Sequence, residues 1–186
     1  MPVSLLEGPF TVADYHRLAE LGILHEDDRV ELLNGQVIVM GPIGPRHAGC
    51  VDALNRLLSR LVGDFGIVRV RNPVVLGHRA EPEPDLAILR PRADWYRGSH
   101  PRPNDVLLVV EVADTSLEYD RDVKLPLYAA ASIPEVWLVD LDGERIEAYR
   151  APGSEGYGDL VTASRGETLS ALHLAGLTLG VDEILG

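Results

Sequence analysis

The stretch VLLVVEVADTS, residues 106–116, joins a long apolar run to a group of acidic and hydroxyl side chains. Its first five residues are aliphatic, and such a run is typical of a strand buried on both faces of a sheet. Glu111 follows the run and precedes Val112-Ala113. A glutamate there lies either near a sheet end or in the interior, where a buried charge needs a partner or a metal ion. The stretch therefore predicts a central strand that carries a functional carboxylate.

A second apolar run begins at another acidic residue. Asp85 follows Pro84 and precedes Leu86-Ala87-Ile88-Leu89. Taken alone, Asp85 is explained equally well as a turn residue at the start of a strand. If the two strands are neighbours, however, Asp85 and Glu111 can reach one cation, and Mg²⁺ prefers oxygen ligands of this kind. The pair predicts a site for Mg²⁺ or Mn²⁺.

Lys124 is the only lysine of the chain, and the other 16 basic residues are arginine. An ordinary surface charge can be either residue, so a lone lysine suggests a role that arginine cannot fill. Lysine is a compact point charge whose pKa responds to burial and to charged neighbours. The alternative is that one lysine survived by chance. On a helix, Asp120, Lys124 and Tyr128 would share one face, where spacing alone favours an exposed ion pair beside a core tyrosine.

The rest of the chain alternates between helical and strand patterns. Thr11 to Asp14 resembles a capping box and opens a helix to about Leu21. Asn34-Gly35 stands between two alternating apolar runs, which predicts a hairpin. We expect a second helix from His47 to about Leu61 and a third within 117–132, its start made uncertain by Pro126. Further strands are expected at 67–71, 74–77, 85–89, 106–112, 135–140 and 144–150, with short strands after Gly153.

This order predicts an α/β fold, a mixed β-sheet flanked by helices with additional N- and C-terminal strands. The length of 186 residues favours a single domain, residues 1–186. No run approaches the ~18 apolar residues of a membrane helix. The first residues lack the basic and apolar parts of a signal peptide. The single cysteine, Cys50, is expected to be a small buried helix residue, and we expect a cytoplasmic protein without membrane contact.

The net charge of −12 argues against broad, nonspecific binding of nucleic acid. The charge is uneven, because residues 69–102 carry 7 arginines against 4 acidic residues. Arg69, Arg71 and Arg79 precede Asp85 in this segment and could contact the phosphates of DNA. Solvation of strand edges explains them equally well. In the same segment, His78 and His100 are interpreted as surface residues, and Trp95-Tyr96 as the aromatic anchor of a long loop.

Several short motifs in a fixed order resemble one family. They are Pro84-Asp85, the run from Glu111 to Ser116, then Asp120, Lys124 and Tyr128, and the stretch EVWLVD at 135–140. The stretch VELLNG at 30–35 and His47 fit the same order. Together they resemble the Uma-type restriction endonucleases of the PD-(D/E)xK nuclease superfamily, over about residues 8 to 180.

The resemblance implies a restriction endonuclease-like fold and roles for five residues. Asp85 and Glu111 would be metal ligands, Lys124 the catalytic lysine, and Glu31 and His47 neighbours in the site. Gln36 and Ser116 are weaker candidates. The superfamily lysine should stand two residues after Glu111, where this chain has Ala113. Members of the family commonly carry it on the following helix, as Lys124 would be.

The sequence thus favours a Mg²⁺-dependent DNA endonuclease in which metal-activated water attacks a phosphodiester bond. Two alternatives stay open: a catalytically silent binding or regulatory module with a nuclease fold, and a metal-dependent hydrolase of small phosphoesters. A double-strand cut needs two sites, which favours a homodimer. The aliphatic residues around Val37–Met40 and Leu169–Leu179 are the candidate surfaces for it.

Overall fold

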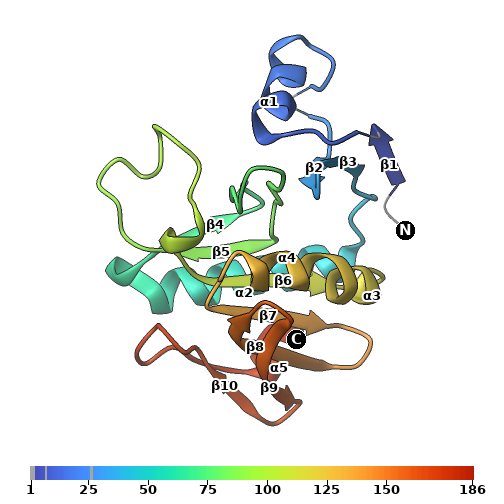
Figure 1. The fold of residues 1–186 in the computed structure, drawn as a ribbon. Helices are drawn as coiled ribbons and strands as arrows, with labels where there is room; N and C mark the ends of the chain where they lie inside the picture. The colour runs from blue at the N-terminus through green and yellow to red at the C-terminus, as the bar shows by residue number, and fades with distance from the viewer. Residues whose placement is uncertain (1–2, 7, 26) are drawn as a thin grey trace.

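The centre of the molecule is a six-stranded mixed sheet (Figure 1). The computed structural model describes residues 3–6, 8–25 and 27–186. The strand order is β4-β5-β6-β7-β8-β9, and only β6 and β7 run parallel to each other in this sheet, which lies wholly within the described residues. The predicted α/β architecture is confirmed. The strands are β4 (Ile67–Val70), β5 (Leu86–Leu89), β6 (Val106–Ala113), β7 (Glu135–Asp140), β8 (Arg145–Gly153) and β9 (Gly156–Ser164).

Helices cover both faces of this sheet. A parallel pair needs a crossover connection, and here it consists of α3 (Leu117–Tyr119), a π-helical turn η3 (Asp120–Lys124) and α4 (Leu125–Ala130). α4 packs on one face. α2 (Pro45–Val62) and α5 (Val181–Leu185) pack on the other, and Cys50 is buried there as predicted.

β6 is buried along its whole length, so its alternating side chains enter two different cores. Leu108 and Val110 belong to the core under α2. Val109 belongs to the core under α4. Since side chains alternate along a strand, Glu111 shares the side of Val109 and faces α4.

β5 follows the same rule and lies antiparallel to β6. Ala87 pairs with Val109 in the ladder and lies in the core under α4. The side chain of Asp85, two residues before Ala87, therefore lies on the same side of the sheet as that of Glu111. Alternation and pairing together bring the two predicted ligands to one place.

The N-terminal part forms a smaller layer beside the main sheet. β2 (Val30–Leu33) and β3 (Gln36–Val39) make the predicted hairpin, and β1 (Val3–Leu6) pairs with β3. Asn34 and Gly35 both have positive φ angles, 52° and 79°, as a tight two-residue hairpin turn requires. α1 (Val12–Glu20) begins with the predicted capping box and packs on the hairpin.

The C-terminal part adds the expected short strands, β10 (Thr168–Ser170) and β11 (Thr178–Gly180), which pair with each other. Single 3₁₀ turns occur at η1 (Gly63–Phe65) and η2 (Pro103–Asp105). The predicted strand at 74–77 is wrong. Pro73 before the segment and Pro82 and Pro84 opposite it lack the N–H groups of a regular ladder, so the segment is a loop with isolated hydrogen bonds.

The surfaces proposed for a dimer are largely covered by other parts of the same chain. Val37 and Ile38 are buried in the N-terminal layer, and Leu169 and Leu179 are buried in the core under α2 and α5. Leu172, between these last two residues, is 52% exposed, so the second segment keeps some apolar surface. Among the described residues, no helix combines the length and the apolar character that crossing a membrane requires.

Candidate functional site

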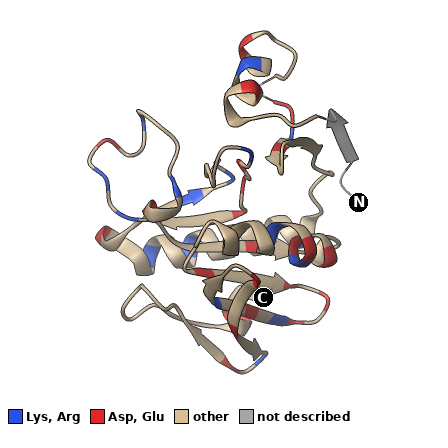
Figure 2. Cartoon of the chain, in the orientation of Figure 1, with Lys and Arg blue, Asp and Glu red and all other residues tan. Residues whose placement is uncertain are grey.

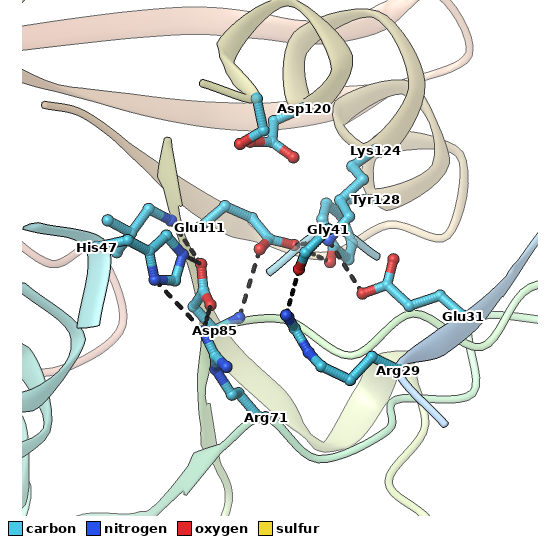
Figure 3. Close-up of polar contacts among 12 residues, drawn as sticks. Arg29, Glu31, Gly41, His47, Arg71, Asp85, Glu111, Asp120, Lys124 and Tyr128 are labelled. Carbon is cyan, nitrogen blue, oxygen red and sulfur yellow. Dashed lines mark hydrogen bonds and ion pairs between the residues drawn. The ribbon is translucent and has the colours of Figure 1, made fainter. Parts of the chain in front are cut away.

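A cavity of about 460 Å³ opens where β5 and β6 meet the β2–β3 hairpin, the start of α2 and the η3 turn. The five site residues predicted from the sequence all line it, and Figure 3 shows their side chains directed toward one another. They are Glu31, His47, Asp85, Glu111 and Lys124. Residues up to 93 positions apart in the chain thus meet in one place.

Asp85 is held by contacts on both of its oxygens. Oδ2 accepts a hydrogen bond from the Val112 amide at 2.9 Å and lies 3.0 Å from Nε2 of His47. Oδ1 accepts from the Arg71 guanidinium at 3.3 Å. Burial by itself raises the pKa of Asp85, but the hydrogen bond and charge of His47 and the Val112 amide outweigh it and hold the pKa below its ordinary value. Asp85 is therefore kept as a carboxylate.

Glu111 is deeper, with 4% of its surface exposed. Its Oε1 accepts from the Tyr128 hydroxyl at 2.6 Å and from Lys124 Nζ at 3.2 Å. Its Oε2 faces the backbone amide of Asp85 at 3.4 Å. Burial raises the pKa of Glu111, although Lys124 acts against the shift.

Lys124 joins two carboxylates from different layers of the molecule. Its Nζ donates to Glu31 Oε1 at 3.1 Å as well as to Glu111, and only 3% of the residue is exposed. Burial alone would lower the pKa of Lys124, but the surrounding carboxylates, with Glu111 and Glu31 foremost, raise it well above its ordinary value. The ammonium group is therefore protonated at neutral pH.

Glu31 has an unused acceptor. Its Oε1 also accepts from the backbone amide of Glu83 at 3.1 Å. Its Oε2 is buried and has no hydrogen-bond partner within the described part of the chain. Buried polar atoms normally have a partner, because leaving one unpaired costs free energy. A cation or a bound water in the cavity would supply one.

Asp120 corrects one prediction. It is buried and accepts from the Ser116 hydroxyl at 2.6 Å, instead of forming an exposed ion pair with Lys124. The reason is the η3 turn, in which the Leu125 amide bonds to the Asp120 carbonyl five residues back. A π turn does not stack residues four apart as an α-helix does. Burial raises the pKa of Asp120 to about 6.

More acidic than basic side chains line the cavity. Three buried carboxylates line it, those of Glu31, Glu111 and Asp120. Lys124 is the only buried cationic side chain in the described structure. Asp85 adds a further negative charge, which Arg71 and His47 partly balance. A divalent cation would neutralise the excess, and the oxygen-rich donor set is the kind that suits Mg²⁺ or Mn²⁺. The residues present therefore fit such an ion.

The model of the Uma2 family, described as "Putative restriction endonuclease", matches residues 12–182. The chain belongs to the Uma2 family. The predicted resemblance is thereby confirmed. No curated protein matches the chain.

The fold of this Uma2 chain also resembles a crystal structure from Anabaena variabilis ATCC 29413, described as a putative nuclease belonging to DUF820. The TM-score is 0.72, and the likeness covers 95% of this chain and 98% of the other. The sequence identity is 14%, so this likeness concerns the fold.

Of the three arginines predicted to contact phosphate, only Arg71 lines the cavity. Arg69 turns to Asn72, with which its guanidinium forms a 2.7 Å hydrogen bond. Arg79 is exposed beside the turn at Gly35. Of the weaker candidates, Ser116 lines the cavity, whereas Gln36 is exposed at the start of β3.

Three features of the site were not predicted from the sequence: the hydrogen bond from the Tyr128 hydroxyl, the burial of Asp120, and Arg29 in the lining of the cavity. The resemblance included Asp120 and Tyr128 among its motifs, but their spacing with Lys124 favoured an exposed ion pair beside a core tyrosine. Nothing in the sequence marked Arg29.

The expectations for the loop between β5 and β6, and for His78 before β5, have different outcomes. Tyr96 is buried and donates to the Arg90 carbonyl at 2.9 Å, so it anchors the loop as predicted, whereas Trp95 is 63% exposed. In Figure 2, basic positions mark this loop. His78 is exposed as predicted. His100 is not a simple surface residue, because it lies half-buried beside His16 and Glu81.

Proposed function

We propose that this protein is a divalent-metal-dependent endonuclease that hydrolyses phosphodiester bonds of DNA. The observation that carries the proposal is the meeting of Asp85, Glu111 and the only lysine of the chain in one cavity of a Uma2-family fold. The unpartnered Oε2 of Glu31 beside them supports it.

Asp85 and Glu111 would hold the ion, Mg²⁺ or Mn²⁺. When bound, such an ion polarises the scissile phosphate and lowers the pKa of water, which makes a nucleophile available near neutral pH. His47 and the Val112 amide fix one oxygen of Asp85, and Arg71 fixes the other. These contacts orient the carboxylate before substrate arrives.

Lys124 would stabilise negative charge that develops on the phosphate, or hold the attacking water. An ammonium group has three N–H donors. Two of them are used on Glu31 and Glu111. The third is available to a phosphate oxygen or a water in the cavity. Held between two buried carboxylates, Lys124 needs no reorganisation when that charge develops.

A second candidate function has its own support. Besides Lys124, the basic side chains that line the cavity are Arg29 and Arg71 within the described residues, and the net charge is −12. A hydrolase of small phosphoesters would need less positive surface than a DNA enzyme. A silent binding module is the third reading, and the unpartnered carboxylate oxygen of Glu31 argues against it.

One experiment separates these functions. Supercoiled plasmid DNA and a chromogenic phosphodiester are each incubated with the protein and Mg²⁺ or Mn²⁺. The endonuclease proposal expects nicked or linear plasmid, lost with chelator and with Asp85→Asn. The matched control is Asp122→Asn, a change of the same kind at an exposed position of the η3 turn. Turnover of the small ester alone would favour the second candidate, and no turnover of either would favour the silent module.

Two further expectations belong to this proposal. A cut through both DNA strands requires two sites, so the active form would be a homodimer. A single buried cysteine, Cys50, is consistent with a reducing cytoplasm.

A further inference from the structure

Three potential metal ligands from separate segments meet outside the cavity described above. They are His16 on α1, Glu81, which forms an isolated β-bridge with Leu32 of β2, and His100 in the loop between β5 and β6. One ligand atom from each lies within 4.8 Å of the other two. None of the three lines the cavity of Asp85 and Glu111. His16 and His100 instead border a separate hollow of about 550 Å³.

The backbone beneath each ligand is fixed. The amide and carbonyl of Glu81 both pair with Leu32 of β2, at 2.7 and 3.4 Å. α1 is tied by the Val12 amide, which donates to the His78 carbonyl at 2.9 Å. Next to His100, the Pro101 carbonyl accepts from the Val75 amide at 3.0 Å. The three side chains therefore approach one another from anchored positions.

Glu81 is 3% exposed, and its carboxylate contacts one side chain. Both of its oxygens lie near the same atom, Nε2 of His16, at 3.0 and 2.9 Å. A single N–H cannot point well at two acceptors at once. The carboxylate of Glu81 therefore faces the imidazole of His16 with both oxygens, and one N–H does not fully satisfy the two acceptors.

The plain alternative is an ion pair between protonated His16 and Glu81. It accounts for that contact but gives His100 no role. The His100 ring lies edge-on to His16 with the ring centroids 6.2 Å apart. Two imidazoles and one carboxylate form a donor set that proteins use for Zn²⁺.

We propose that His16, Glu81 and His100 form a second metal site, one that takes Zn²⁺ or a similar transition-metal ion. In a tetrahedral site with ~2.1 Å bonds, zinc ligand atoms lie about 3.4 Å apart. Small side-chain shifts would bring the three ligand atoms, now within 4.8 Å of one another, to that spacing. The imidazoles of this site select a different ion from the carboxylates of Asp85 and Glu111, which suit Mg²⁺. The bound ion links α1 to the loop that carries Trp95 and so stiffens the outer wall of the molecule.

The test uses tag-free, chelator-treated full-length protein with Asp85→Asn and Glu111→Gln, which removes the ligands proposed for Mg²⁺. Zn²⁺ is titrated in competition with a chromophoric chelator. We expect one equivalent of Zn²⁺ to bind. His16→Ala and His100→Ala should each weaken this binding at least about 10-fold, since even supporting residues of metal sites cost that much. His173→Ala is the matched control, because it changes an exposed histidine elsewhere.

A second measurement needs no variant of the histidines. Zn²⁺ should protect His16 and His100, but not His173, from diethyl pyrocarbonate modification mapped by peptide mass spectrometry. Zinc affinity that is unchanged by both alanine variants, or equal modification of His16 with and without Zn²⁺, would overturn the site. Because the Asp85 and Glu111 carboxylates are absent, neither result depends on whether the protein is a nuclease.

Discussion

At the scale of single residues, Lys124 concentrates the chemistry of the cavity. It is buried and donates to carboxylates from the hairpin and from β6. An arginine there would keep the charge but replace a compact ammonium by a larger planar fork. Position and size, not charge alone, therefore distinguish the only lysine from the 16 arginines.

We predict that Lys124→Arg lowers DNA cleavage on the order of 10²-fold, the loss seen when a catalytic electrostatic group is removed. The rate is measured under single-turnover conditions, and thermal melting checks that the fold persists. Arg121→Lys is the control, since Arg121 lies in the same turn but pairs with Glu147, outside the cavity. Cleavage by Lys124→Arg at the wild-type rate would make the lone lysine an accident of composition.

Tyr128 contacts the buried carboxylate of Glu111 directly. Its hydroxyl donates to the buried carboxylate at 2.6 Å, and a donor stabilises the charged form. Burial already raises the pKa of Glu111. Loss of the donor raises it further, so a smaller fraction of Glu111 is ionised at a given pH and available to a metal ion.

Tyr128→Phe should therefore shift the acid limb of the pH profile of kcat/KM to higher pH by about one unit, from the ~1.5 kcal/mol of a hydrogen bond to a charged group. Tyr157→Phe is the matched control, because that hydroxyl donates to the Ile133 carbonyl at 2.9 Å, away from the cavity. Coincident profiles for Tyr128→Phe and wild type would show that Glu111 does not control the acid limb.

At the scale of elements, the η3 turn places Asp120 and Lys124 in the cavity. Pro126 follows it and has no N–H to donate to the carbonyl four residues back, so it interrupts the α-helical ladder there. The Leu125 amide bonds to the Asp120 carbonyl in the wider pattern. The proline thus provides a local physical reason for the turn.

Pro126→Ala should allow a regular α-helix and move Lys124 from its position between Glu31 and Glu111. We expect cleavage to fall about 10- to 100-fold, the scale of an ångström misplacement in an active site, with no loss of thermal stability. Pro152→Ala, in β8, is the control. Full activity in Pro126→Ala would mean that the π turn is not needed to position the lysine.

The sequence predicted the elements whose signals are local. The Asn34-Gly35 turn, the capping box at Thr11 and the apolar strands all reappear in the structure. It marked Pro126 as an uncertainty in the third helix but did not predict the π turn, in which the Leu125 amide bonds to the Asp120 carbonyl. The strand expected at 74–77 failed because Pro73, Pro82 and Pro84 lack the N–H groups of a regular ladder.

The candidate site was predictable to a similar degree. Strand alternation places the side chains of Asp85 and Glu111 on one side of the sheet. Lys124 stands out because it is the only lysine of the chain. The contact between Lys124 and Glu31 spans 93 residues and depends on how the hairpin sits on the sheet. Such tertiary contacts carry no local signal, and the resemblance to a family supplied Glu31 and His47 instead.

At the scale of the whole molecule, the assembly state is the main prediction left from the sequence. Most of the aliphatic side chains first chosen for a dimer are buried within the chain, although Leu172 is 52% exposed. Double-strand cleavage still favours two copies. Light scattering at micromolar concentration should give twice the 20.3 kDa chain mass. A mass near 20.3 kDa would remove the simplest account of double-strand cutting.

We propose that Asp85 and Glu111 hold one divalent cation between the sheet and the η3 turn. The most direct measurement is anomalous diffraction from crystals soaked in Mn²⁺. We predict a peak in the cavity with an oxygen of each carboxylate close to the ~2.1 Å of Mg²⁺–oxygen bonds. The same peak should be absent in Asp85→Asn crystals. A wild-type cavity that contains no manganese, with Asp85 still bound to His47 and Glu111 to Tyr128, would contradict the claim.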